Sequence, residues 1–226
     1  MNSGLSLPIR PIDHWHESLN IRDGKLTHER HTINMIILLS VVLGLVGFYA
    51  RKQIHQFYLV ILGVVTLISA ATIIWYIPLF EQMIVSGYLG LAFYAVVMIT
   101  GGFKKTSKIG KGLRAVRKEY SIFGFVFLIP HFYVYLLTYI NGTLTWEFYG
   151  VIAMVIMIPL FVMSFDYFKK KMDIKKWFRI QKFAYLAYLL IFIHLLVSGT
   201  GEHTYEYVLI FSVDRRASCR ERVYGL

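Results

Sequence analysis

The chain has almost no cysteine and few acidic side chains. Cys219 is the single cysteine among 226 residues, which excludes an intrachain disulfide and the C-x-x-C-H motif of covalently attached haem. Asp and Glu number 13 against 24 Lys and Arg, and the formal net charge is +11. A haem in this chain would therefore have to be held without covalent attachment to the protein.

Two familiar motifs are also missing. Residues 1–30 lack the basic start and uninterrupted apolar core of a secretory signal, so the first apolar segment itself would direct membrane insertion. The stretch G-G-F-K-K-T-S-K-I-G-K-G (101–112) lacks the G-x-x-x-x-G-K-[ST] spacing of a phosphate-binding loop. We expect any flavin or nicotinamide nucleotide domain to belong to another polypeptide.

What the chain has in abundance is apolar sequence. Hydrophobic residues make up 57% of it, above the roughly 45–50% of soluble domains. Six apolar segments have about the 18–25 residues needed to cross a bilayer. They are Ile33–Ala50, Gln56–Phe80, Ile84–Gly101, Tyr120–Ile140, Phe148–Phe165 and Lys182–Gly199. The sequence predicts an all-α fold, a polytopic transmembrane helix bundle of about six spans.

Basic residues gather in alternate connectors between these segments. Residues 81–83, 141–147 and 200–204 contain no Lys or Arg. The other connectors hold Arg51 and Lys52; then Lys104, Lys105, Lys108, Lys111, Arg114, Arg117 and Lys118; then Lys169, Lys170, Lys171, Lys175, Lys176, Arg179 and Lys182. Positive loops stay in the cytoplasm. We therefore predict a multi-pass protein of the cell membrane with cytoplasmic basic loops and an exterior amino terminus. Its charge marks topology in the lipid bilayer and does not indicate nucleic-acid binding.

The predicted domain organisation has three parts. Residues 1–31 form a polar leader, 32–204 a transmembrane haem-binding helix bundle, and 205–226 a truncated or non-native tail. The leader carries four histidines, for which a metal site and a solvated segment are the two alternatives, and the spacing favours the second. They are His14, His16, His28 and His31.

Two apolar segments each contain one histidine in their interior. His131 lies in the fourth segment and His194 in the sixth. By the predicted topology both segments run from cytoplasm to exterior, and at 1.5 Å per residue His131 lies ~18 Å beyond Glu119. Both histidines therefore fall in the outer half of the membrane and can face one another. Ionisable groups inside spans favour function, although a histidine bonded to a backbone carbonyl is the alternative for either residue alone.

Two facing imidazoles without a carboxylate or cysteine in the spans suit an iron porphyrin better than a bare cation. The porphyrin dianion supplies the charge compensation that a dication in hydrocarbon would lack. Gly124 and Ala187 lie seven residues before His131 and His194, and both are small where a flat macrocycle would lie. Close helix contact is the alternative role for both. The apolar walls would come from Phe127, Leu128, Leu190 and Ile191.

The residues around these histidines form a recognisable pattern. L-R-A-V-R-K-E-Y-S-I-F-G-F-V-F-L-I-P-H-F-Y-V-Y-L (113–136) and K-K-W-F-R-I-Q-K-F-A-Y-L-A-Y-L-L-I-F-I-H-L-L (175–196) resemble the ferric reductase-like transmembrane domain superfamily. The likeness covers residues 87–199 and is greatest to the haem-binding membrane subunit of the bacterial periplasmic methionine sulfoxide reductase system. The resemblance implies a non-covalent, bis-histidine haem b with His131 and His194 as iron ligands.

The sequence departs from that family at two places. The sixth span of the family usually opens with W-x-x-L-H, whereas this chain reads W-F-R-I-Q and has Gln181 at the position of a further histidine. A second haem is therefore not expected. The family also has one more span, and we expect the natural carboxyl end to be missing after Tyr205–Val213, where R-R-A-S-C-R-E-R-V resembles translated adapter sequence.

The resemblance implies electron transport across the membrane. Electrons would pass from quinol or a cytosolic flavin reductase to an exterior acceptor such as a periplasmic oxidoreductase, with quinone or FMN supplied by the partner. The chain would be the electron-transfer subunit of an oxidoreductase and, with both axial positions of its iron filled, a relay with no position open for substrate. The alternative is a haem-free membrane transporter or scaffold subunit, although the repeat symmetry typical of transporters is absent.

Overall fold

The protein is described by a computed structural model covering residues 25–74, 81–104, 106–140 and 148–198. Within these ranges every regular element is helical and no strand is present, which confirms the predicted all-α fold. The elements are α2 (Lys25–Tyr49), α3 (Arg51–Gln56), α4 (Tyr58–Ile74), η1 (Glu81–Val85), α6 (Tyr88–Ile99), η2 (Thr100–Gly102), α7 (Lys108–Ala115), α8 (Arg117–Ile140), α9 (Phe148–Val162), α10 (Asp166–Lys171), α11 (Ile174–Gln181) and α12 (Phe183–Ser198).

Each of the six predicted apolar segments contains one principal helix, but their lengths differ. Two stretches, Arg117–Leu137 and Ile174–Val197, are long and apolar enough to cross a membrane. In the other four segments the apolar helical stretches within the described residues have 10–17 residues each, below the length of a span, although α2 as a whole has 25 residues. For α6 the reason is local: the π-helical turn η1 and the positive φ of Gly87, 79°, separate its start from the preceding residues.

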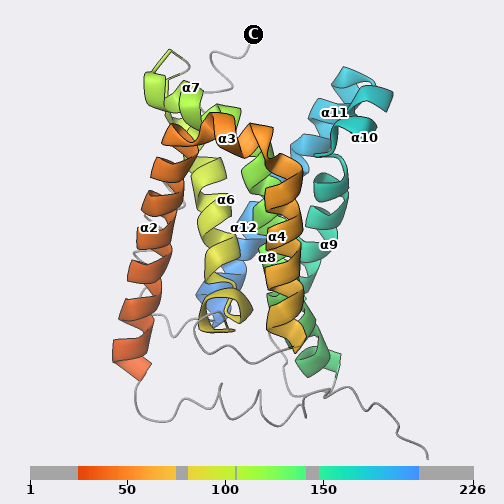
Figure 1. The fold of residues 1–226 in the computed structure, drawn as a ribbon. Coiled ribbons are helices and arrows are strands. Elements are labelled where there is room, and N and C mark those ends of the chain that lie inside the picture. The colour runs from red at the N-terminus through yellow and green to blue at the C-terminus, as the bar shows by residue number, and fades with distance from the viewer. Residues whose placement is uncertain (1–24, 75–80, 105, 141–147, 199–226) are drawn as a thin grey trace, which may run out of the picture.

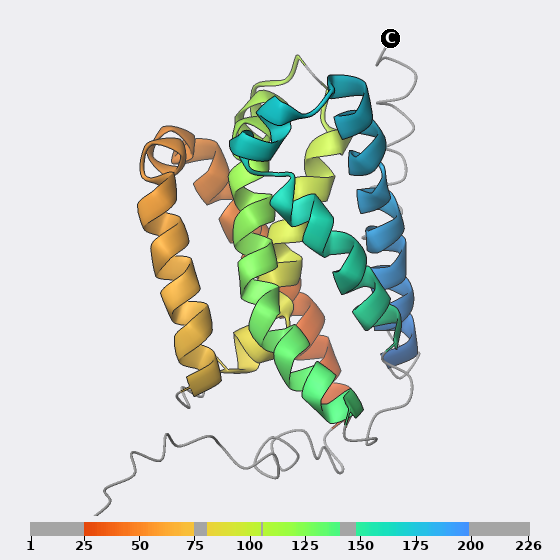
Figure 2. The same ribbon diagram turned by 90° about the vertical axis from the view of Figure 1, so that its right-hand side faces the viewer.

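The helices form a bundle with α8 near its centre (Figures 1 and 2). α8 packs against α4 and α6, α6 also packs against α2, and α9 joins α8 to α12. α8 and α12 descend in the same direction in both views, as predicted for the two histidine-bearing segments. The basic elements α3, α7, α10 and α11 all lie at one end of the bundle, called here the basic end (Figure 1). The alternation of basic connectors in the sequence is therefore reproduced in space.

Aromatic and sulfur side chains fill the centre in two clusters. Around α8, Phe93 stacks on Phe127 with ring centroids 5.7 Å apart, and both belong to the buried cluster shared by α4, α6, α7 and α8. On the other side of α8, Phe125 stacks on Phe161 at 4.2 Å, and Ala187 is buried with them. The two clusters hold α8 from opposite sides, and so position His131 relative to the helices around it.

Glycines allow α6 and α8 to approach closely. A Cβ on Gly90 would lie 2.6 Å from Leu128 Cγ and 3.1 Å from the Gly124 carbonyl oxygen. A Cβ on Gly124 would lie 3.0 Å from Phe93 Cβ. Small residues at such crossings are typical of membrane helix pairs. Gly124 is thus a helix-contact residue, the second of the two predicted roles, and its role beside a macrocycle stays a prediction.

Large apolar side chains cover the outward faces of the first helices. On α2 and α4 these side chains are 45–76% exposed. So many exposed large apolar side chains on two helices are unusual for a surface in contact with water. They include Leu38, Val41 and Leu45 on α2 and Leu59, Val60 and Leu67 on α4. The hydroxyls of Thr66 and Thr72 bond to carbonyls four residues earlier in α4 and so do not need water.

One of the predicted domain limits, the end of the leader at residue 31, lies within the described residues. α2 begins at Lys25, so the first helix extends back into the segment predicted as a polar leader. His14, His16, the predicted tail 205–226 and Cys219 lie outside the described residues.

Candidate functional site

The imidazoles of His131 and His194 meet between α8 and α12. Their ring centroids are 6.4 Å apart and the ring planes are inclined by 72°. α12 packs mainly on α9, whereas α8 is surrounded by α4, α6 and α9, so side chains such as those of the two histidines make the contact between α8 and α12. The two rings therefore lie close enough to face one another, as predicted, whereas their depth in a membrane stays a prediction.

A backbone carbonyl orients His131. Its Nδ1 lies 2.7 Å from the carbonyl oxygen of Val85, the last residue of the π-helical turn η1. A carbonyl oxygen only accepts, so Nδ1 carries the proton and donates it, which leaves the lone pair on Nε2. The ring of Tyr135, one turn further along α8, lies 4.6 Å from the His131 ring. In other proteins, metal-binding histidines are held in one tautomer by the same kind of hydrogen bond to a backbone carbonyl.

Each imidazole lies against a glycine of a neighbouring segment. A Cβ on Gly87 would come 3.2 Å from Cγ and Nδ1 of His131. A Cβ on Gly150, in α9, would come 3.2 Å from Cε1 and Nδ1 of His194. Ordinary side chains would crowd both rings at these distances. The pair of histidines is therefore built from four segments, the turn before α6 and the helices α8, α9 and α12.

The residues predicted as apolar walls pack against neighbouring helices. Phe127 stacks on Phe93 of α6, and Leu128 contacts Gly90 of the same helix. Ala187 is 3% exposed and packs with Phe125 and Met154. Ala187 therefore faces side chains of α8 and α9, so the structure does not open a flat surface beneath His194 at that position. Leu190 and Ile191 are partly buried on α12.

The two imidazoles are the donor groups that this site offers to a metal. Among the described residues no three His, Cys, Asp or Glu side chains lie close enough together to hold a metal ion. Two imidazoles fall short of the three or four protein ligands of a zinc site, but they match the two axial positions of a six-coordinate haem.

The distance between the two rings is close to the distance between two histidine rings bound to one iron. Two imidazole nitrogens on one iron lie about 4 Å apart, since each metal–nitrogen bond is about 2 Å, and their ring centres about 6 Å apart. The observed 6.4 Å fits this arrangement. Both ring planes would contain the nitrogen–iron axis, so their inclination is not restricted. The residues present therefore fit an iron held on both sides by histidine.

An apolar cavity of about 290 Å³ lies on the far side of α12 from α9. It is lined mainly by α2, α6 and α12 and reaches Leu195, the residue after His194, and Tyr188, about two turns earlier in α12. Ser40 supplies the polar part of its lining. Neither of the two histidines is part of this lining, so the cavity adjoins their site without containing it.

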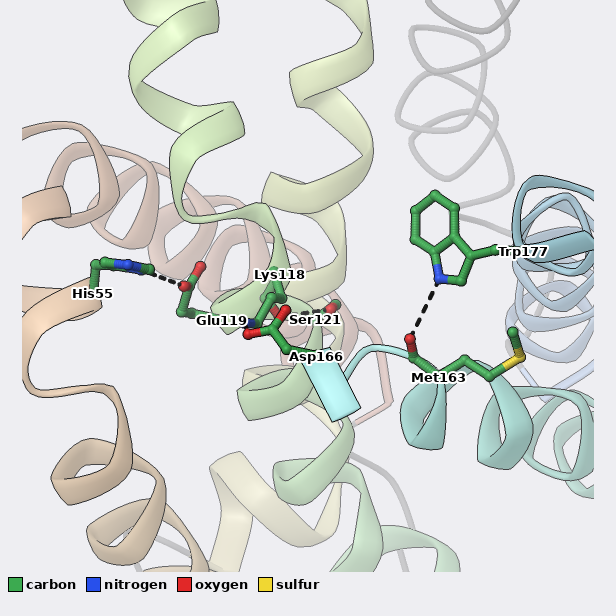
Figure 3. A network of polar contacts seen from close by, with 7 residues as sticks. All are labelled: His55, Lys118, Glu119, Ser121, Met163, Asp166 and Trp177. Atoms are coloured by element: carbon green, nitrogen blue, oxygen red, sulfur yellow. Dashed lines mark hydrogen bonds and ion pairs between the residues drawn. The ribbon is translucent and has the colours of Figure 1, made fainter. Parts of the chain in front are cut away.

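Two further polar residues lie at the basic end. Gln181, which replaces the family histidine, ends α11 and is partly buried. Glu119 is 2% exposed near the start of α8, with Oε1 3.0 Å from Nδ1 of His55 (Figure 3). Glu119 lies one residue before the predicted segment Tyr120–Ile140, so the prediction that the spans contain no carboxylate is not affected by it. Its burial could not be read from the sequence, because it depends on the packing of other helices against α8.

Comparisons with protein families, curated proteins and solved structures found no match to this chain.

Proposed function

We propose that this chain is a membrane protein that binds one haem b between His131 and His194 and relays electrons through it. The donor would be quinol or a cytosolic flavin reductase, and the acceptor would lie on the exterior side. The observation that carries the proposal is the meeting of two imidazoles from parallel helices at 6.4 Å. The resemblance of residues 87–199 to the ferric reductase-like transmembrane domain superfamily supports the same reading.

The chain's own residues would prepare this site in three ways. The hydrogen bond to the Val85 carbonyl keeps the His131 proton on Nδ1, so Nε2 of the neutral ring is the nitrogen that could bind a metal. Gly87 and Gly150 give the two rings room. The aromatic clusters on both sides of α8 exclude water from the helix that carries His131. His131 and His194 would hold a bound haem, which would supply one-electron redox chemistry.

The surface of the bundle supports a multi-pass arrangement in the membrane. Two helices reach spanning length, and the exposed apolar faces of α2 and α4 match a lipid environment. The basic connectors meet at one end of the bundle, which supports placing that end in the cytoplasm. His131 and His194 would then lie toward the exterior.

The decisive measurement is a reduced-minus-oxidised absorbance spectrum of the full chain purified after haem-replete expression. We expect b-type bands in the wild type and their loss in His131→Ala and His194→Ala. Gln181→Ala is the matched control, because it removes the polar side chain at the position of the family's further histidine, and we expect it to keep the bands. Retention of bis-imidazole spectra in either histidine variant would refute the assignment.

The same experiment tests the alternative. A colourless wild-type protein that is folded and monodisperse would favour a haem-free transporter or a scaffold subunit for a partner enzyme. In that case the paired histidines would be a hydrogen-bonded packing feature of the bundle.

A further inference from the structure

The carboxylate of Glu119 is buried at the basic end with one oxygen unsatisfied. Its Oε1 lies 3.0 Å from Nδ1 of His55, and its Oε2 has no hydrogen-bond partner among the described residues. On the adjoining helix α4, the hydroxyl of Tyr58 is likewise buried without a partner in that part of the chain. An unsatisfied buried polar atom is costly, so two of them at one place call for a functional explanation.

Among the titratable groups around Glu119, His55 is the one that makes a hydrogen bond to its carboxylate. Lys118, its neighbour in α8, pairs with Asp166 of α10 at 2.6 Å, and its Nζ lies 5.6 Å from the Tyr58 ring centre (Figure 3). The cation next to Glu119 in sequence is thus already paired. His55 from α3 and Tyr58 from α4 are the titratable groups that the neighbouring helices bring to this carboxylate.

His55 connects the buried carboxylate to solvent. The His55 side chain is 76% exposed whereas that of Glu119 is 3% exposed. Imidazole is the side chain best suited to exchange protons with water near neutral pH. Chains of carboxylate and imidazole groups that reach into a membrane bundle mark proton relays in pumps and transporters. The geometry has the elements of such a relay: an exposed imidazole, a direct hydrogen bond and a buried acceptor.

We propose that His55 and Glu119 form a proton-exchange site through which the bundle takes up a proton from the basic side when it gains an electron. The proton comes from water at His55, passes through the imidazole and converts the Glu119 carboxylate to the carboxylic acid. When the electron leaves for the exterior acceptor, the proton returns by the same route, so no other bond is made or broken. The link to electron flow rests on the proposed function, whereas the proton site itself does not.

The first test needs no haem. Infrared difference spectra of the purified full chain are recorded as the pH is stepped, in the region where protonated carboxyl groups absorb. We expect a band from a buried carboxylic acid that is lost in Glu119→Gln and kept in Asp166→Asn, the matched variant of a nearby exposed carboxylate. In His55→Gln the band should remain and appear more slowly after a pH jump. A band that survives in Glu119→Gln overturns the proposal.

If the buried-site variant Glu119→Gln fails to fold, the variant His55→Gln still tests the proposal. His55 is exposed, so His55→Gln should fold normally, and an unchanged rate of band appearance in it would overturn the relay by itself. The second test follows the midpoint potential of the bound haem. We expect the potential to fall as the pH rises in the wild type and in Asp166→Asn, and to lose this dependence in Glu119→Gln. Equal pH dependences would overturn the coupling.

The two proposals fail in different ways. A colourless protein that shows the Glu119 band would end the electron relay and leave the proton site standing. A haem spectrum without a titrating Glu119 band would do the reverse.

Discussion

Gly87 lies against the imidazole ring of His131, where a Cβ atom would come within 3.2 Å of the ring's Cγ and Nδ1. Its φ of 79° is in the left-handed region that side chains rarely adopt. The same residue thus turns the chain from η1 into α6, places the Val85 carbonyl at His131 and leaves room for the ring. Three requirements of the candidate site therefore meet at one glycine.

Gly87→Ala should weaken both the fold and the site. The backbone strain should cost about 1–2 kcal/mol, and the new methyl group should displace the His131 ring. We expect a lower melting temperature in detergent and a lower ratio of haem to protein. Gly63→Ala is the matched control, because nothing lies within 4 Å of a Cβ there. If Gly87→Ala behaves like that control, the proposed role of Gly87 is wrong.

Gly150→Ala should separate stability from haem binding. Gly150 is in the helix α9, where alanine is favoured over glycine by about 1 kcal/mol, but the methyl group would lie 3.2 Å from the His194 ring. We expect little loss of thermal stability together with a reduced haem content or an altered spectrum. Gly44→Ala in α2 controls for the helix propensity, since a Cβ there meets nothing within 4 Å. An unchanged spectrum would show that the His194 ring has freedom to move.

Gly90→Val should destabilise the contact between α6 and α8. The first added atom alone would lie 2.6 Å from Leu128 Cγ, so the helices must separate, at a cost of about 1–3 kcal/mol. Thermal unfolding in detergent measures the loss. Exposed Val64 on α4 offers the control Val64→Gly, whose effect should stay near the propensity difference of roughly 0.5 kcal/mol. Equal effects would contradict the close packing described for Gly90 and Gly124.

Tyr120→Phe should cost about 0.5–1.5 kcal/mol, the usual contribution of one hydrogen bond. The Tyr120 hydroxyl donates to the Leu43 carbonyl at 2.8 Å and ties α8 to α2, and the residue is 2% exposed. The comparison variant is Tyr49→Phe, since Tyr49 is 76% exposed and its hydroxyl faces solvent or lipid headgroups. A drop in melting temperature is expected for Tyr120→Phe alone.

Much of the architecture follows from local rules that a sequence displays. Apolar length and the absence of strand patterns predict the helices, and the alternating basic connectors predict that α7, α10 and α11 meet at one end. Counting residues from Glu119 to His131 and along α12 to His194 places both histidines at one level, because the helical rise is constant. These inferences need no knowledge of which helices are neighbours.

The failures came where neighbours matter. The seven-residue spacing places Gly124 on the face of His131, but it does not reveal that this face packs closely against α6 at Gly124. Glu119 reads as a residue of a basic connector, and it is buried only because α3 and α4 pack over it. Helical periodicity predicts which residues share one face of a helix, but it does not predict which helix or ligand that face contacts.

The sequence by itself determined a helical chain with two segments long and apolar enough to cross a membrane, and with one histidine on each of two helices of the same direction. Only the tertiary structure decided that Val85 fixes the tautomer of His131, that Gly87 and Gly150 lie against the two rings, and that Glu119 depends on the exposed His55. The reason is that helix formation and membrane insertion depend on local composition, whereas hydrogen bonds and ring contacts join residues dozens of positions apart, and only the packing of the whole bundle brings these together.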